Sequence, residues 1–248
     1  MSNRILVIGD SCKDVFKYGT CNRLSPEAPV PIFNLISSTE NGGMAANVKN
    51  NIASLGCNVD ICTNRGWESI TKTRLIDLRT NHMFMRLDCN EDKYRKITKN
   101  TLKNIDYNSY DCVVISDYNK GVLSEENIKY ISQQHPLVFL DTKKIIGDFC
   151  NDIFTIKINI HEYQASKQNI NAELEDKIIV TLGHKGCRYR GVVYPVPKTE
   201  VKDVSGAGDT FLAALAVEYS RSASIEKAII FANECATKVV QKRGVSII

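Results

Sequence analysis

Apolar and polar positions follow two different periods along this chain. Short runs rich in Ile, Val and Leu, apolar on both faces, indicate buried strands, and the stretches between them have apolar residues at helical spacing. The strand runs fall at 4–10, 58–64, 112–116, 136–141, 152–159 and 177–183, and the clearest helical stretches at 44–56, 124–134, 207–220 and 224–242. Strands buried on both faces and separated by helices predict an α/β fold with a doubly wound, mainly parallel sheet.

Two segments do not fit that sheet. Residues 16–38 carry three prolines among alternating apolar and polar positions, and a second exposed-looking strand lies at 80–90. Because proline cannot donate a hydrogen bond within a ladder, the proline-rich segment does not suit a central strand. We expect a single domain over 1–248 in which both segments form a small antiparallel flap, or lid, over one end of the sheet.

Composition and charge narrow the function classes. The 248 residues are 43% hydrophobic, which is enough for a sizeable core. The net charge of +4 comes from Lys and Arg scattered among acids, so neither a nucleic-acid partner nor a membrane surface is expected. A strand near residue 1 and apolar runs far shorter than the ~20 residues of a membrane span predict neither leader nor anchor.

Cysteine and histidine positions give no sign of a metal centre. The nine cysteines stand singly, which is typical of reduced thiols in a cytoplasmic protein. No metal-binding spacing is present among the four histidines, His82, His135, His161 and His184.

The stretch DVSGAGDTF, residues 203–211, places a glycine-rich turn and an acid at the start of an apolar helix. The N–H groups of Gly206, Ala207 and Gly208 would point outward there, where the backbone and the helix dipole favour an anion such as phosphate. Asp209 beside them suits a base that takes the proton of a hydroxyl during phosphoryl transfer. The alternative is a first-turn acid that supports the helix dipole, worth under ~1 kcal/mol.

Polar residues also follow the predicted strands, where doubly wound sheets bind ligands. Asp10 and Asp14 follow the first strand and suit either sugar hydroxyls or a turn cap. Gly42, Gly43 and Asn47 open the helix at 44–56, as part of a ligand site or of a plain helix start.

A second acid motif lies at 157–164, KINIHEYQ. Asn159 and Glu162 are three residues apart and suit Mg²⁺, which usually keeps part of its water shell, or alternatively the two halves of a helix capping box. The following stretch, VTLGHKG at 180–186, suits an approaching nucleotide or an ordinary hairpin.

Taken in this order, the motifs resemble those of the ribokinase-like (PfkB) sugar kinases. NGGMAANVKNNIASLG at 41–56 and DVSGAGDTFLAALA at 203–216 look like that family's two signatures. RLSPEAPVP at 23–31 and ISDYNKGVL at 115–123 are similar to the kinase domain of the bifunctional heptose-phosphate enzymes of lipopolysaccharide synthesis. The resemblance extends over nearly the whole chain.

The resemblance implies a reaction and a set of site residues. The reaction is transfer of the γ-phosphate of ATP, with Mg²⁺, to the anomeric hydroxyl of D-glycero-D-manno-heptose 7-phosphate, giving the 1,7-bisphosphate. The implied catalytic residues are Asp209 with Gly206, Ala207 and Gly208. The implied ATP and magnesium contacts are Asn159, Glu162, Thr181, Gly183, Gly186, Asn233 and Lys143. The expected substrate contacts are Asp10, Asp14, Gly42, Gly43, Asn47 and Asp117, with Arg23, Arg86 or Lys120 as candidates for the sugar phosphate.

Two departures from the family leave alternatives open. The chain is shorter than its relatives by about a helix and a strand after residue 66, and it stops without the usual last element or a nucleotidyltransferase domain. We expect the sheet or the flap to be reduced and a homodimer to form through the lid. Other readings are a different ribokinase-like sugar or nucleoside kinase, or an inactive ligand-binding homologue. A dinucleotide-dependent oxidoreductase is disfavoured because no G-x-G-x-x-G follows the first strand.

Overall fold

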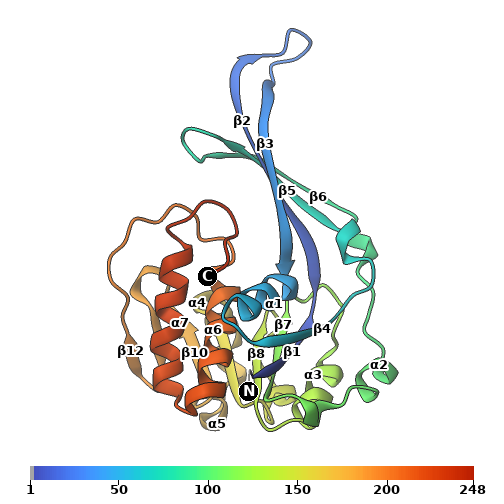
Figure 1. Ribbon diagram of the computed structural model, residues 1–248, viewed down its shortest axis with the longest axis vertical. Coiled ribbons are helices and arrows are strands. Elements are labelled where there is room, and N and C mark those ends of the chain that lie inside the picture. The colour runs from blue at the N-terminus through green and yellow to red at the C-terminus, as the bar shows by residue number, and fades with distance from the viewer. Residues whose placement is uncertain (1–2) are drawn as a thin grey trace.

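A computed structural model describes residues 3–248, and Figure 1 shows a larger sheet wrapped by helices with a smaller sheet projecting from it. The larger sheet has the strand order β12-β11-β10-β9-β8-β7-β1-β4. Its strands are β1 (Arg4–Gly9), β4 (Asn58–Thr63), β7 (Cys112–Asp117), β8 (Val138–Thr142), β9 (Thr155–Asn159), β10 (Ile178–Thr181), β11 (Cys187–Tyr189) and β12 (Val192–Tyr194). Pairs from β4 to β10 are parallel, and the β11–β12 hairpin adds an antiparallel edge, so the prediction of a mainly parallel sheet is confirmed.

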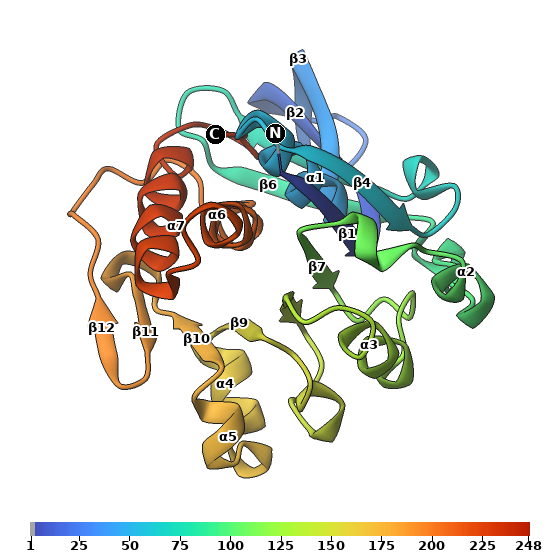
Figure 2. The ribbon, with the colours of Figure 1, turned by 60° about the horizontal axis from the view of Figure 1, so that its bottom comes forward.

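Helices cover both faces of this sheet, as Figure 2 shows. The seven described α-helices are α1 (Ala45–Ser54), α2 (Lys99–Lys103), α3 (Glu125–Ser132), α4 (Ile160–Ser166), α5 (Ala172–Glu175), α6 (Ala207–Ser222) and α7 (Ile225–Val239). Alternate residues of β1 point to opposite faces, so Ile5 and Val7 join the core under α1, α6 and α7, while Leu6 and Ile8 join the core on the other face. Within the first of these cores, α6 is buried continuously from Asp209 to Val217.

Four strands form a second sheet, which we call the lid sheet. They are β2 (Ser11–Leu24), β3 (Pro31–Met44), β5 (Thr71–Asp77) and β6 (Met83–Cys89), in the order β3-β2-β5-β6. The two hairpins β2–β3 and β5–β6 are antiparallel, but β2 and β5 pair in parallel. The lid sheet is therefore larger than the segments 16–38 and 80–90 expected from the sequence, because it starts at Ser11 and includes all of β5.

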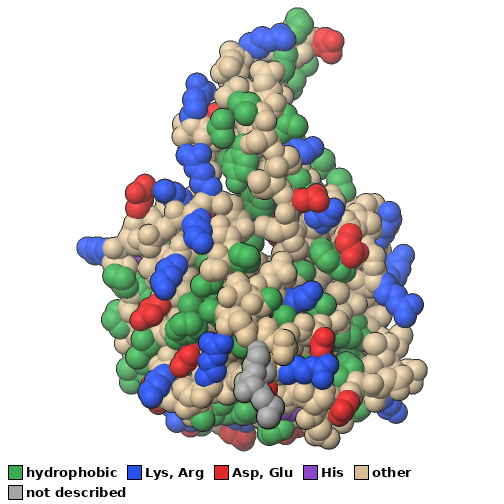
Figure 3. All heavy atoms as spheres, in the orientation of Figure 1, with side chains coloured by type: hydrophobic (Ala, Val, Ile, Leu, Met, Phe, Trp, Pro, Cys, Tyr) green, Lys and Arg blue, Asp and Glu red, His purple; other side chains and the backbone are tan. Residues whose placement is uncertain are grey.

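The lid sheet is partly covered by protein and partly bare. Phe16, Tyr18 and Ile76 are buried together, with Val245 of the C-terminal segment packed against them. Apolar side chains elsewhere on the projecting strands are exposed, and Figure 3 shows hydrophobic groups along this part of the molecule. The exposed residues of these strands and their connecting loop include Leu24, Val30, Leu35, Ile36, Met83, Phe84, Met85 and Leu87.

Strand β4 forms the edge of the larger sheet. Residues 64–70 lead from it directly into β5, through one short 3-10 turn at Trp67–Ser69. This connection adds no strand beyond β4 to the large sheet. Within residues 3–248, no helix combines the length and the apolar character that crossing a membrane requires.

Candidate active site

Asp209 lies in the first turn of α6, close to the carboxyl ends of the central strands. Its side chain is buried, and both carboxylate oxygens accept hydrogen bonds. The Asn47 amide at the start of α1 donates to Oδ2 at 2.9 Å, and the Tyr118 hydroxyl after β7 donates to Oδ1 at 2.7 Å. Three segments that are far apart in the sequence thus converge on one carboxylate.

Burial raises the pKa of Asp209 to about 6, and the nearby negative charge of Asp141 adds to the rise. The hydrogen bonds from Asn47 and Tyr118 and the positive charge of Lys157 act in the opposite direction. A carboxylate with a pKa close to neutrality remains mostly ionised at pH 7 and accepts a proton more readily than an exposed aspartate does. This is the tuning that a general base needs.

Lys157 forms a buried ion pair beside the start of α6. Its Nζ lies 2.7 Å from Asp141 Oδ2, and the two side chains are 4% and 3% exposed. A Cβ added to Gly208 would come within 2.8 Å of this ammonium, so glycine at 208 lets the positive charge approach the helix start. Sequence reasoning missed Lys157, although a single lysine inside the apolar strand β9 is a recognisable signal, since buried lysines need a partner.

The glycine turn before α6 supplies backbone donors for an anion. Gly206 adopts φ 80°, a left-handed conformation that favours glycine, and its N–H and that of Gly208 donate to no protein acceptor within residues 3–248. The Ala207 N–H donates to the Val204 carbonyl at 3.2 Å. Of the three donors expected from the sequence, two are therefore directly available in this conformation.

A cavity of about 480 Å³ adjoins this turn. Ala207 and Gly208 form one part of its wall, and the larger apolar part includes Phe211 and Val240. The cavity also brings together four residues that were expected to contact ATP: Thr181, Gly183, Gly186 and Asn233. Its size and its mainly apolar lining with a few polar groups suit a nucleotide.

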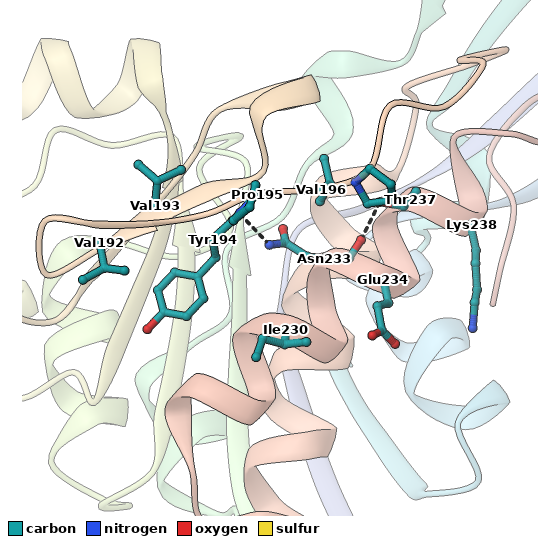
Figure 4. A pocket seen from close by; sticks show the side chains of 11 residues that line it. Val192, Val193, Tyr194, Pro195, Val196, Ile230, Asn233, Glu234, Thr237 and Lys238 are labelled. Carbon is teal, nitrogen blue, oxygen red and sulfur yellow. Dashed lines mark hydrogen bonds between the residues drawn. The ribbon is translucent and has the colours of Figure 1, made fainter.

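Asn233 separates this cavity from a neighbouring hollow of about 610 Å³, shown in Figure 4. Its side-chain amide donates to the Tyr194 carbonyl at 3.0 Å, and its own carbonyl accepts from the Thr237 hydroxyl at 2.7 Å. The Asn233 amide therefore holds the start of the segment after β12, whose Val196 and Pro197 line both hollows.

Asn159 and Glu162 form a complete capping box at the start of α4. The Asn159 side chain accepts from the Glu162 N–H at 2.9 Å, and Glu162 Oε2 accepts from the Asn159 N–H at 2.7 Å. The other Glu162 oxygen pairs with Lys143. Because both residues already have protein partners, they fit Mg²⁺ through its water shell and not as direct ligands. Within residues 3–248, no group of three or more His, Cys, Asp and Glu side chains is placed to hold a metal.

Asp10 lies on the sugar side of the expected site. It is fully buried, and its Oδ2 accepts from the Tyr118 N–H at 2.5 Å. Its Oδ1 has no hydrogen-bond partner among the described residues. Burial, followed by the negative charge of Asp117, raises the pKa of Asp10 to about 6. A buried acceptor without a donor is suited to a ligand hydroxyl.

Asp14 lies beside Gly43 at the base of the lid sheet. A Cβ on Gly43 would come within 2.3 Å of Asp14 Oδ2, so only glycine leaves this carboxylate in place. Arg74, which sequence reasoning missed, donates to Asp14 Oδ1 at 2.5 Å. Gly42 packs more simply against α1, since a Cβ there would meet the Ala46 Cβ at 2.6 Å.

The remaining expected substrate residues stay predictions, and the structure shows where each one lies. Arg23 is exposed and lies one residue before the end of β2, which forms the projecting hairpin of Figure 1 with β3. Arg86 pairs with Asp88, and Lys120 pairs with Glu91 at 3.0 Å. Asp117 is buried and is held by Lys144 at 2.9 Å, which gives it a structural partner at the end of β7.

Solved structures with the same fold are sugar and nucleoside kinases. Ribokinase from Arabidopsis thaliana, solved with ribose and ATP, matches 98% of this chain and 94% of its own with a TM-score of 0.69 and 14% identity. Phosphofructokinase-2 from Escherichia coli, solved with potassium, matches 100% of this chain and 95% of its own with a TM-score of 0.71 and 13% identity. The protein therefore has the ribokinase-like fold.

Sequence comparison adds a family resemblance to the shared fold. The family model described as pfkB family carbohydrate kinase matches residues 150–248, so this part of the chain is similar to that family. Curated relatives include the bifunctional protein HldE of Sulfurimonas denitrificans, 31% identical, and that of Helicobacter pylori strain J99, 32% identical, each matching 97% of this chain. The chain spans 61% and 63% of the lengths of these two relatives. The first alignment extends over 292 positions, 44 more than the chain has residues, so the relatives contain segments that this chain lacks.

Proposed function

We propose that the protein transfers the γ-phosphate of ATP to a hydroxyl of a sugar, with Asp209 as the general base. The observation that carries this proposal is the position of Asp209. It lies one residue after Gly208, which lines the nucleotide-sized cavity, and it bonds Asn47, whose helix begins beside the sugar side of the site. A base between the two ligand regions is what direct phosphoryl transfer requires.

Each of these residues then has a role in the reaction. Asp209 takes the proton of the attacking hydroxyl while the bond from that oxygen to the γ-phosphorus forms, and the bond from this phosphorus to the β–γ bridging oxygen breaks, so that ADP leaves. The Gly206 and Gly208 N–H groups and the Lys157 ammonium face the negative charge that develops on the transferred phosphoryl group. Asp10 orients the sugar through its unpaired Oδ1. Mg²⁺ bound to the ATP phosphates would supply further charge neutralisation, with Glu162 meeting it through water.

For the substrate, we propose D-glycero-D-manno-heptose 7-phosphate, phosphorylated at its anomeric hydroxyl to the 1,7-bisphosphate. Identity of about 30% to bifunctional HldE proteins and the motifs at 23–31 and 115–123 support this choice. Another sugar or nucleoside remains the alternative substrate, because fold does not fix specificity. Asp209 and the glycine turn at 206–208 are both present, which argues against an inactive homologue.

An ATP-consumption assay tests the proposal. The purified protein with Mg²⁺ is offered heptose 7-phosphate, sedoheptulose 7-phosphate, fructose 6-phosphate, ribose and adenosine, and we expect turnover with the heptose phosphate. Asp209→Asn should lower kcat by at least ~10²-fold and leave ATP binding intact, as expected when a general base is lost. The exposed Asp92→Asn serves as the matched control. If a folded, ATP-binding protein consumed no ATP with any member of the panel, the kinase proposal would be refuted. Turnover with another member alone would keep the kinase and assign it a different substrate.

A further inference from the structure

We propose that Tyr118 selects a sugar hydroxyl over water as the acceptor of the phosphoryl group. The Tyr118 hydroxyl occupies the position on the general base, Asp209, that an attacking hydroxyl needs. It keeps water out of that position until a sugar hydroxyl takes its place. The proposal rests on the proposed function, and it adds the residue that prevents ATP from being hydrolysed when no sugar is bound.

Both oxygens of the Asp209 carboxylate are occupied in the structure. The Asn47 amide donates to Oδ2 at 2.9 Å, and the Tyr118 hydroxyl donates to Oδ1 at 2.7 Å. A general base must have an oxygen within hydrogen-bond reach of the hydroxyl whose proton it takes. Because Asp209 is only 4% exposed, an attacking hydroxyl reaches the carboxylate only when one of the two donors gives way.

Tyr118 is the donor that can be replaced, since Asn47 is held in place. Asn47 is buried in the first turn of α1, and its side-chain oxygen accepts from the Asn51 amide at 3.2 Å. Tyr118 lies in the loop between β7 and α3 and is only partly buried. A sugar hydroxyl that takes the place of the Tyr118 hydroxyl exchanges one hydrogen bond to the carboxylate for another, so the net cost of the exchange is small.

Tyr118 also lies between the sugar side and the phosphate side of the site. Its N–H donates to Oδ2 of Asp10, an expected sugar contact, at 2.5 Å. Nζ of Lys143, an expected ATP contact, lies 5.4 Å from the centroid of the Tyr118 ring. Burial, followed by the negative charge of Asp209, raises the pKa of the Tyr118 hydroxyl well above its usual value. The hydroxyl therefore stays protonated and donates to Asp209 from the place where the attacking hydroxyl would lie.

Loss of the Tyr118 hydroxyl would give water access to Asp209 Oδ1. Asp209 would then take a proton from that water while the bond from the water oxygen to the γ-phosphorus forms. The bond from this phosphorus to the β–γ bridging oxygen breaks, and ADP and inorganic phosphate leave. In the wild type the Tyr118 hydroxyl fills the position of this water, so the base meets a reactive hydroxyl only when a sugar supplies one.

ATP hydrolysis without any sugar tests the proposal. The assay follows ADP formation at saturating ATP with Mg²⁺ at pH 8, where Asp209 is mostly ionised. Tyr118→Phe should raise the rate at least ~10-fold over wild type, because a general base contributes ~10²–10⁴-fold once water reaches it. Tyr163→Phe is the matched control and should keep the wild-type rate, since the Tyr163 hydroxyl bonds Glu175 away from the site. The double variant Tyr118→Phe/Asp209→Asn should return to the wild-type rate.

A second variant covers the case in which the phenylalanine ring itself excludes water. Tyr118→Ala leaves room for water and should also hydrolyse ATP faster than wild type. Unchanged hydrolysis in both Tyr118 variants would overturn the proposal. Faster hydrolysis that persists in the double variant with Asp209→Asn would overturn it as well, because that reaction would not use the base. If Tyr118→Phe hydrolyses ATP through Asp209 but the wild type phosphorylates no sugar, the sugar-kinase proposal fails and the exclusion of water by Tyr118 stands.

Discussion

The hydrogen bond from Tyr118 to Asp209 gives a prediction whose size follows from the structure. Tyr118→Phe removes the hydroxyl that donates to Asp209 Oδ1 at 2.7 Å and leaves the aromatic ring in place. This bond stabilises the ionised carboxylate and so lowers the pKa of Asp209. Without it the pKa rises, and the base becomes protonated at a higher pH.

The expected shift is about one pH unit. A hydrogen bond to a charged group contributes ~1.5–3 kcal/mol, and one pKa unit corresponds to about 1.4 kcal/mol. Water entering beside the phenylalanine replaces part of the bond, so the lower end of the range applies. The pKa of Asp209 in wild type is about 6, so the acidic limb of the activity profile should lie near pH 6. In the variant it should lie near pH ~7, and activity at pH 6 should fall by about fivefold while activity at pH 9 stays close to wild type.

The measurement is kcat/KM for the sugar between pH 5 and 9 at saturating ATP. Tyr163→Phe is the control, because the Tyr163 hydroxyl bonds Glu175 away from the site. An acidic limb that does not move would show that Tyr118 has no role in setting the charge of Asp209. A lower KM with an unchanged limb would instead identify Tyr118 as a steric block to the sugar.

Four further outcomes follow. Asp209→Asn should raise the free energy of unfolding at pH 7 by up to ~3 kcal/mol. The pKa of Asp209 is higher in the folded protein than in the unfolded one, so the wild type loses stability as the pH rises through the interval between these two pKa values. Thermal melts should show this gain shrinking as the pH falls from about 6 to about 4. Gly43→Ala should raise KM for the sugar and leave ATP-analogue binding unchanged, since its Cβ would displace Asp14. Gly208→Ala should lower kcat by pushing Lys157 from the helix start, as steady-state kinetics would detect. Light scattering should give the mass of a homodimer, and Met85→Glu should yield monomers if the exposed lid sheet forms the contact.

The central sheet was predictable because its strands are local and apolar. Ile5 to Ile8 and Cys112 to Ile115 are buried on both faces, so a continuous apolar run identified them. The parallel pairing of β2 with β5 was not predictable. Strand β5 mixes Lys72 and Arg74 with apolar positions, and its partner is fixed by tertiary packing and not by a turn.

The same contrast holds for the site. Asp209 and its glycine turn were found because one short stretch contains both the acid and the donors. Tyr118 and Lys157 were missed because their partners, Asp209 and Asp141, are distant in the sequence and come close only in the folded sheet. The sequence could not decide whether Asn159 and Glu162 form a helix capping box or a Mg²⁺ site. The reason is physical, because the capping box that starts α4 also places the Glu162 carboxylate at the strand ends.

The short β4–β5 connection does not remove what holds the lid sheet over the site. Strands β2 and β3 continue directly from β1 and into α1, and the Ala45 N–H bonds the Asp10 carbonyl at 2.9 Å where they meet. The Asn41 amide also donates to the Val245 carbonyl at 2.9 Å, which joins the lid sheet to the C-terminal segment. The sequence predicts that the segment this chain lacks falls after residue 66, next to β4 at the sheet edge, whereas Asp209 lies close to the carboxyl ends of the central strands. We therefore expect the shorter connection to alter the exposed sheet edge and to leave the proposed phosphotransfer site intact.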